Sequence, residues 1–203
     1  LDRPARLPDL WRHFLGFATT LLDRVYLLTG HQGVLDITIY GQEDLDERLK
    51  AGQGCLLLGS HLGSFEVLRA LGLARSDLDM RVVMETNQTP GVDLILQRLN
   101  PQMAETVIPL QSPDALLQVQ EAFKNGAVVG FLGDRVVDPK RSVVAPFLGG
   151  NAPFPTGPLH IARRLDVPVV LFFGIHRGGN RYDIHLEPFR DPASGPEGEQ
   201  ASL

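Results

Sequence analysis

Short apolar runs alternate along the chain with segments whose apolar and polar positions follow a helical period. The apolar runs predict strands, and they cover residues 34–40, 55–58, 81–85, 106–109, 127–132, 142–147, 167–175 and 182–186. The helical segments cover residues 7–29, 42–51, 65–73, 92–99, 113–124 and 156–165. This alternation indicates an α/β fold, a single layered domain whose mostly parallel central sheet is flanked by helices. Turn residues at 177–180 add an antiparallel hairpin, which we expect at the edge of the sheet.

The pattern changes at residue 190. Residues 1–189 form the predicted domain, and residues 190–203 form a polar, Pro-, Gly- and Ser-rich tail of the kind that stays flexible. The whole chain has 203 residues, 43% of them hydrophobic, which is enough for one sizeable core. Its net charge of -5 gives no basic footprint for nucleic acid. The single cysteine, Cys55, rules out an internal disulfide and fits a small core residue.

The helical segment at residues 7–29 has an apolar stripe that contains several aromatic residues. The stripe includes Leu10, Phe14, Phe17, Leu21, Leu22, Val25 and Leu28. Packing against the domain is one explanation, and lying in a membrane interface is the other. In either case we expect the domain to leave part of the stripe uncovered. The chain contains no run of 18 apolar residues, so the sequence predicts no transmembrane helix within it.

The most informative stretch is CLLLGSHLGSFEVLRA, at residues 55–70. It predicts a buried strand, a tight turn that carries His61, and a helix with Ser64 as N-cap and Glu66 in its first turn. Ligands of open α/β sheets bind at the carboxyl ends of strands, where this turn falls. Glu66 can accept from one imidazole nitrogen and leave the other to take a proton from a hydroxyl. The structural alternative is a surface pair with no chemistry.

Two further strand ends carry polar side chains: Glu85 with Asn87, and Asp134 with Arg135. If these strands neighbour the one that leads to His61, all three groups converge on one crevice. A local ion pair or turn is the alternative for Asp134 and Arg135 taken alone. The remaining histidines lack metal-ligand spacing, and no nucleotide-binding fingerprint is present, so we expect neither a metal nor a cofactor.

The segment from His61 to Glu66, HLGSFE, resembles the HX4(D/E) motif of the glycerolipid acyltransferase superfamily. The surrounding pattern, an apolar strand followed by G-S-H-x-G-x-x-E, is most similar to the bacterial lipid A biosynthesis (lauroyl/myristoyl) acyltransferase family. Four later segments resemble the same family in the same order: GDR at 133–135, APFLG at 145–149, PTGP at 155–158 and VPVV at 167–170. The resemblance extends over about residues 7–189.

This resemblance implies an acyltransferase that moves a fatty acyl group from an acyl thioester to a hydroxyl of a membrane glycolipid or lipid A-like acceptor. The thioester, carried by acyl carrier protein or coenzyme A, is a co-substrate and not a cofactor. His61 is then the general base and Glu66 its partner. The candidate substrate-binding residues are Ser64, Glu85, Asn87, Asp134 and Arg135. Arg135 stands where many lipid A acyltransferases have Gln, and its guanidinium fits phosphate oxygens.

The implied location is the cytoplasmic face of the bacterial inner membrane, with the protein either peripheral or anchored by a segment outside this chain. The expected partners are the acyl carrier protein or acyl-CoA, the membrane lipid acceptor and the membrane surface, with no nucleic acid. Two other functions fit the same fold. One is a non-catalytic lipid- or partner-binding module, and the other is a thioesterase that transfers the acyl group to water.

Overall fold

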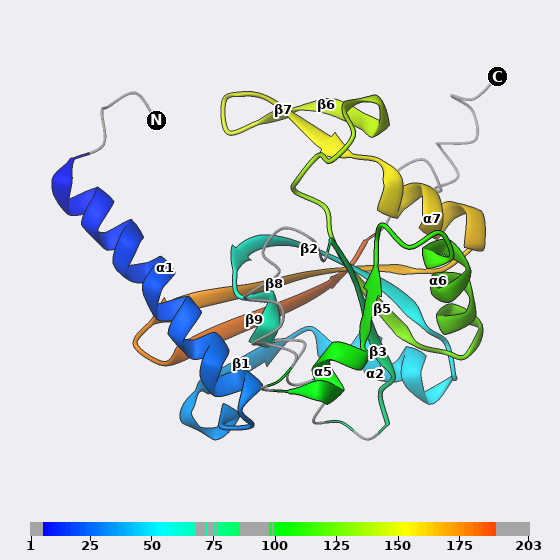
Figure 1. Cartoon of the computed structure of the whole chain (residues 1–203), viewed down its shortest axis with the longest axis horizontal. Coiled ribbons are helices and arrows are strands. Elements are labelled where there is room, and N and C mark those ends of the chain that lie inside the picture. The colour runs from blue at the N-terminus through cyan, green and yellow to red at the C-terminus, as the bar shows by residue number, and fades with distance from the viewer. Residues whose placement is uncertain are drawn as a thin grey trace.

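The computed structural model describes residues 6–67, 72, 75, 77–85, 98 and 100–189. The strands are β1 Asp36–Tyr40, β2 Cys55–Gly63, β3 Met80–Met84, β4 Val107–Pro109, β5 Val128–Leu132, β6 Ser142–Phe147, β7 Gly150–Pro155, β8 Val169–Gly178 and β9 Arg181–Pro188. The helices are α1 Leu7–Leu28, α2 Gln42–Lys50, α5 Pro101–Glu105, α6 Ala115–Lys124 and α7 Gly157–Leu165, with short 3₁₀ turns η1 Gln32–Val34 and η2 Pro139–Arg141. Figure 1 shows helices around a central twisted sheet, and β6 and β7 above it as a separate ribbon.

Seven strands form the central sheet in the order β1-β9-β8-β2-β5-β3-β4. Every neighbouring pair is parallel except β8 and β9, so the predicted mostly parallel α/β fold is confirmed. The antiparallel β8–β9 hairpin also forms, but it lies inside the sheet and not at its edge. The reason is that β1 adds to the outer side of β9 in parallel, with Ile37 opposite Tyr182.

The core is split into two layers by the sheet. Cys55 and Leu57 of β2 pack with Leu27 of α1 and Leu45 of α2 on one face. Leu56 of β2 belongs to the opposite layer, which α6 and α7 cover with residues such as Val119 and Ala162. Alternate residues of one apolar strand therefore serve both layers, which is why the run reads as continuously hydrophobic.

Most predicted elements are confirmed to within a few residues, and the structure adds strand β7 and helix α5. The helix α5 begins at Pro101, where we expected a helix to stop. Proline is compatible with the first turn of a helix because the N–H groups there have no intrahelical acceptor. Of the expected helix at 65–73, residues 65–67 are helical. Most of the expected helix at 92–99, Asn87 and the tail 190–203 lie outside the described residues.

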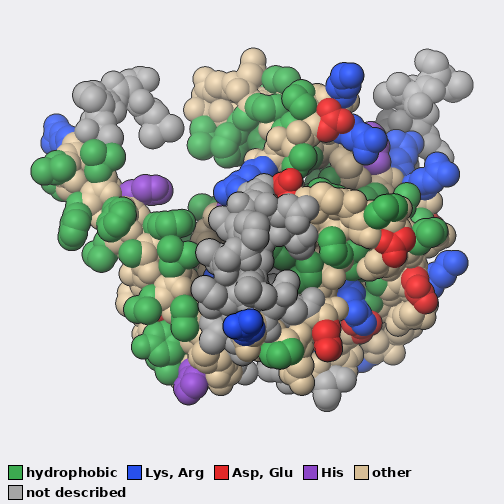
Figure 2. Space-filling model, in the orientation of Figure 1, with side chains coloured by type: hydrophobic (Ala, Val, Ile, Leu, Met, Phe, Trp, Pro, Cys, Tyr) green, Lys and Arg blue, Asp and Glu red, His purple; other side chains and the backbone are tan. Residues whose placement is uncertain are grey.

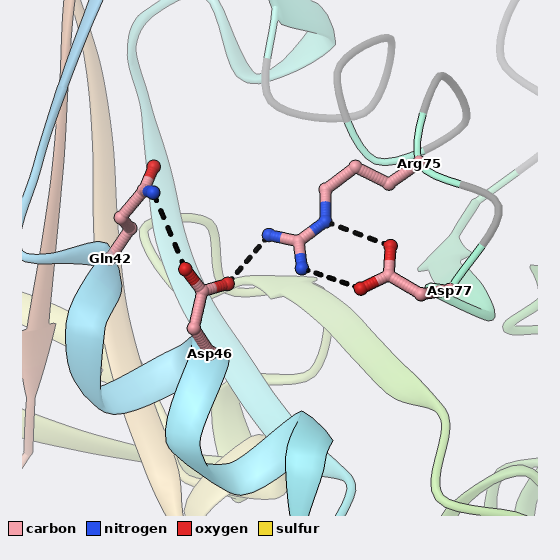
Figure 3. Close-up of polar contacts among 4 residues, drawn as sticks. All are labelled: Gln42, Asp46, Arg75 and Asp77. Atoms are coloured by element: carbon pink, nitrogen blue, oxygen red, sulfur yellow. Dashed lines mark hydrogen bonds and ion pairs between the residues drawn. The ribbon is translucent and has the colours of Figure 1, made fainter.

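A polar cluster around Arg75 ties α2 to the chain that leads into β3 (Figure 3). The Arg75 guanidinium donates to Asp46 Oδ1 at 2.6 Å and holds both carboxylate oxygens of Asp77, at 3.1 and 2.8 Å. Gln42 Nε2 donates to the other oxygen of Asp46 at 3.3 Å. A guanidinium that bridges two carboxylates fixes the approach of these segments more firmly than single surface pairs do.

Helix α1 is attached to the domain by polar contacts and by Leu27, which is buried in the core. The Tyr182 hydroxyl of β9 donates to Asp23 Oδ2 at 2.6 Å, and Arg24 pairs with a buried carboxylate. Most of the large apolar residues of α1 are exposed, among them Leu10, Trp11, Phe14, Phe17 and Leu22. This confirms that the domain leaves part of the apolar stripe uncovered. No helix within the described ranges is long and apolar enough to cross a bilayer.

The β6–β7 ribbon consists of two antiparallel strands joined by a two-residue turn. Phe147 pairs with Gly150, which leaves Leu148 and Gly149 at the tip with positive φ angles of 50° and 81°. Two consecutive residues with positive φ are typical of the turn that matches the twist of a hairpin. The chain continues directly from this turn into strand β7.

Candidate active site

Strand β2 extends further than its apolar run and carries His61 near its carboxyl end. The pairing of β2 with β8 shifts register between Gly59 and Gly63. Gly63 has φ of 77°, and a Cβ atom there would lie 1.7 Å from the carbonyl oxygen of Gly174. Only glycine fits this position, because the two backbones approach too closely for any side chain. The distortion places His61 within a bent strand end, where the sequence predicted a turn.

The imidazole of His61 is held by Asp134, which follows strand β5. His61 Nδ1 lies 2.8 Å from Asp134 Oδ1, and the backbone N–H of His61 donates to Asp134 Oδ2 at 2.9 Å. One carboxylate thus fixes both the backbone and the ring of the same residue. The contact forms because β5 is the direct neighbour of β2 in the sheet.

The charge state of Asp134 follows from these contacts. Burial by itself raises the pKa of the Asp134 carboxyl, but hydrogen bonds from the backbone and ring of His61 outweigh it and hold this pKa below its usual value. An ionised carboxylate only accepts hydrogen bonds, so Nδ1 of the neutral ring carries the proton. The second nitrogen, Nε2, lies on the opposite side of the ring and is able to accept a proton.

Glu66 has a different partner from the one that the sequence predicts. It is buried in the first helical turn after β2, and its Oε1 lies 2.7 Å from Nη2 of Arg24 on α1. The hydrogen bond expected between Glu66 and His61 is replaced by the bond from His61 to Asp134. A buried carboxylate needs a cation or donors, and α1 brings Arg24 to it. The catalytic role predicted for Glu66 stays a prediction.

The other candidate residues that the structure describes lie around the same end of the sheet. Ser64 is buried, and its backbone N–H donates to the Gly174 carbonyl at 2.8 Å. Glu85 directly follows β3, which pairs with β5, so the three predicted strand ends are neighbours as expected. Arg135 is exposed beside Asp134, and Asn87 lies outside the described residues. Their substrate-binding roles stay predictions.

Sequence reasoning missed the contribution of α1 to this region. Asp23 and Arg24 lie on the polar side of α1, whereas the sequence-based prediction for this helix concerned only its apolar stripe. Burial, together with the hydrogen bond to Asp23, raises the pKa of the Tyr182 hydroxyl, so this residue is a neutral donor. The sequence does show Asp23 and Arg24 as adjacent charged residues within the amphipathic segment. Their partners, Tyr182 and Glu66, are distant from them in the sequence.

Two alternatives to this site among the described residues are the thiol of Cys55 and a group of metal ligands. The Cys55 side chain is buried in β2, and this burial raises the pKa of its thiol to about 12, so it is protonated at neutral pH. No group of three or more His, Cys, Asp or Glu side chains in the described part of the chain is arranged to hold a metal ion.

The sequence comparison identifies the family to which this arrangement belongs. Residues 22–200 match the family model described as bacterial lipid A biosynthesis acyltransferase. No curated protein sequence matches the chain. The matched range contains His61, Glu66 and Asp134 together with all seven strands of the central sheet. Since it covers most of the chain, the protein belongs to the bacterial lipid A biosynthesis acyltransferase family and is an acyltransferase.

Proposed function

We propose that this acyltransferase moves a fatty acyl group from an acyl thioester to a hydroxyl of a membrane glycolipid or lipid A-like acceptor, with His61 as general base. The observation that carries the proposal is the pair of hydrogen bonds between His61 and Asp134 at the carboxyl ends of β2 and β5. This is where parallel α/β sheets bind their ligands. The ring is oriented with one nitrogen bound and the other directed away from the carboxylate.

In the proposed reaction, His61 Nε2 takes the proton of the acceptor hydroxyl. The hydroxyl oxygen of the acceptor attacks the thioester carbonyl carbon at the same time. A carbon–oxygen bond forms, the carbon–sulfur bond breaks, and the departing sulfur receives the proton from the imidazolium. Asp134 stabilises that imidazolium through its bond to Nδ1. General base catalysis of this kind contributes about 10²- to 10⁴-fold. No covalent enzyme intermediate is required.

Glu66 and Arg24 act in this proposal as positioning residues. Their ion pair joins α1 to the helical turn that follows His61. Arg135 remains the candidate for a phosphate group, since it is exposed beside Asp134 and its guanidinium matches phosphate oxygens. The phosphate belongs either to the acyl carrier arm or to the acceptor.

The membrane is the proposed location, at the cytoplasmic face of the bacterial inner membrane. The support comes from α1, which is bound to the domain by polar contacts and exposes its aromatic residues. A helix with this orientation places apolar surface where lipid is able to cover it. The acyl donor in the proposal is acyl carrier protein or acyl-CoA, and the acceptor is a lipid in the same bilayer.

The test is a product assay with purified protein. Each acyl donor is supplied with and without vesicles that contain a lipid A-like acceptor, and the acylated lipid and the free fatty acid are both measured by mass spectrometry. We expect acylated lipid that depends on His61. Free fatty acid formed equally with and without acceptor would establish a thioesterase instead. Binding of acyl donor without any product would favour the non-catalytic module.

A further inference from the structure

We propose that the β6–β7 ribbon is a second membrane contact, which inserts its apolar tip into the interface of an anionic phospholipid bilayer. The inference rests on the membrane location proposed above and assigns part of that contact to a segment distant from α1. Lipid is the proposed partner of this apolar surface.

The first observation is that the ribbon exposes large apolar side chains on both of its faces. Val143 and Val144 are consecutive in β6, so they point to opposite faces, and both are exposed. Phe147 and Leu148 continue this surface to the tip, where Leu148 is 75% exposed. A docked protein covers one face of such a ribbon, whereas a bilayer interface surrounds its tip on every side. Apolar exposure on both faces therefore favours lipid.

The second observation is the charge of the segment that contains the ribbon. Residues 139–165 include Lys140, Arg141, Arg163 and Arg164 but no Asp or Glu, in a chain with a net charge of -5. Lys140 and Arg141 lie in η2, directly before β6, with the Asp138 carboxylate 3.7 Å from Arg141. Exposed cations at the base of an apolar tip are complementary to anionic headgroups above the acyl chains.

The third observation is the position of the ribbon relative to α1 and the site. In Figure 1 the ribbon and the N-terminal half of α1 both extend away from the sheet toward the top of the view. Apolar side chains gather on both projections in Figure 2. The ribbon is joined to Asp134 by one short connection through η2. A bilayer that touches both projections therefore contacts a segment that is close in the chain to Asp134, the partner of His61.

The backbone limits how deeply the ribbon enters. A two-stranded ribbon has unpaired backbone groups along both outer edges, which the hydrocarbon core does not tolerate. Pro146, Pro153 and Pro155 remove some of the N–H groups from these strands. The expected depth is the headgroup and upper acyl region, with the tip residues among the first methylene groups.

A single labelled cysteine tests this placement. Leu148→Cys carries an environment-sensitive fluorophore, and Cys55 stays unlabelled because it is buried. The matched control is Leu117→Cys on α6, where Leu117 is exposed to a similar extent, 66%, on a different part of the surface. With vesicles of phosphatidylglycerol and phosphatidylethanolamine we expect a blue shift at position 148 and none at 117. Equal responses at the two positions would overturn the inference.

Vesicle flotation of unlabelled variants gives an independent result. Val144→Asp with Leu148→Asp should lower the bound fraction several-fold, whereas Leu116→Asp with Leu117→Asp on α6 should not. Lys140→Glu with Arg141→Glu should weaken binding to anionic vesicles by roughly fivefold or more per cation replaced. Melting curves of each variant check folding, which the ribbon should scarcely affect because its tip lies outside both core layers.

Two comparisons separate this inference from the proposals on which it rests. His61→Ala should bind vesicles as the parent does, so loss of catalysis leaves the lipid contact measurable. If Phe14→Ser with Phe17→Ser abolishes flotation while the ribbon variants float normally, α1 is the membrane contact and the ribbon inference fails alone. If sedimentation without lipid shows a dimer that Val144→Asp with Leu148→Asp dissociates, a second copy covers the ribbon and the inference is wrong.

Discussion

Two carboxylates near the carboxyl end of β2 have opposite surroundings. The side chain of Asp134 is 31% exposed and its partner His61 is 37% exposed, so this pair is open to solvent and to a substrate. The side chain of Glu66 is only 4% exposed and pairs with Arg24, at 26%, beneath α1. The open pair is suited to proton transfer, and the closed pair is suited to holding elements together.

The difference shows that proximity in the sequence does not select the partner of a histidine. Glu66 is close to His61 along the chain, but Asp134 contacts it from 73 positions away. The sheet order makes β5 the neighbour of β2, and this places the residue after β5 beside the ring. Changes in the open pair should therefore reduce catalysis, and changes in the closed pair should mainly reduce stability.

The largest effect is expected for His61→Ala. It removes the proposed base, so the initial rate of acyl transfer should fall by about 10²- to 10⁴-fold. The melting temperature should remain nearly unchanged, because the exposed ring leaves no core cavity when it is removed. Initial rates and melting curves on the same preparation check this. A variant that transfers at the parental rate would refute the role of His61, and one that unfolds would make it a structural residue.

Asp134→Asn should approach this loss and should be more harmful than Asp134→Ala. The backbone N–H of His61 needs an acceptor, so the amide oxygen of Asn stays with it and the amide NH₂ faces Nδ1. The ring is then forced to carry its proton on Nε2, where it cannot act as a base. A comparable tautomer reversal costs on the order of 10⁴ in kcat in the serine protease triad. If Asn retains more activity than Ala in the same assay, this geometry is not the one used in catalysis.

Arg24→Met and Glu66→Gln should mainly affect stability. Removing one partner of a fully buried ion pair costs about 3–5 kcal/mol, and the partial exposure of Arg24 should reduce this to about 2 kcal/mol. Denaturant unfolding of both single variants and the double variant measures their coupling. A loss of activity in Glu66→Gln that matches His61→Ala, with stability unchanged, would show that Glu66 is the catalytic partner after all.

Tyr182→Phe tests the second contact that holds α1 and should have a smaller effect. It removes the hydrogen bond to Asp23 and leaves that carboxylate without the hydroxyl donor. The expected loss is about 1–2 kcal/mol in the free energy of unfolding. Asp23→Asn is the matched variant on the helix, and it retains a polar group opposite the hydroxyl. If neither change alters the unfolding midpoint, α1 is held by other contacts.

The smallest effect concerns pH. The pKa of Asp134 is lower in the folded protein than in the unfolded chain, so its contacts contribute stability above the unfolded value of about 3.9 and lose it as pH falls through the folded value. The difference in melting temperature between the parent and Asp134→Ala should shrink as the pH falls below about 4. A difference that grows as the pH falls below about 4 would mean that the protonated carboxyl is the form stabilised.

Local patterns were sufficient to predict most of the fold. The apolar run at Cys55 and the alternation of strands with helices depend only on neighbouring residues. The same patterns placed His61 and Asp134 at strand ends, but they paired the ring with Glu66, whereas the ring contacts Asp134. That choice depends on strand order, on the bend at Gly63 and on where α1 docks, and each of these is set by residues far apart in the sequence. The ion pair between Arg24 and Glu66 could not be predicted from the sequence for the same reason.

The tautomer of His61 tests the central claim most directly. Nitrogen NMR of protein labelled with ¹⁵N-histidine distinguishes a ring that carries its proton on Nδ1 from one that carries it on Nε2, and His61→Ala assigns the signals. Near neutral pH the account predicts the Nδ1–H form in the parent and in Glu66→Gln, and the Nε2–H form in Asp134→Asn. If Glu66→Gln changes the tautomer and Asp134→Asn leaves it as in the parent, Glu66 is the carboxylate that orients the ring and the account is contradicted.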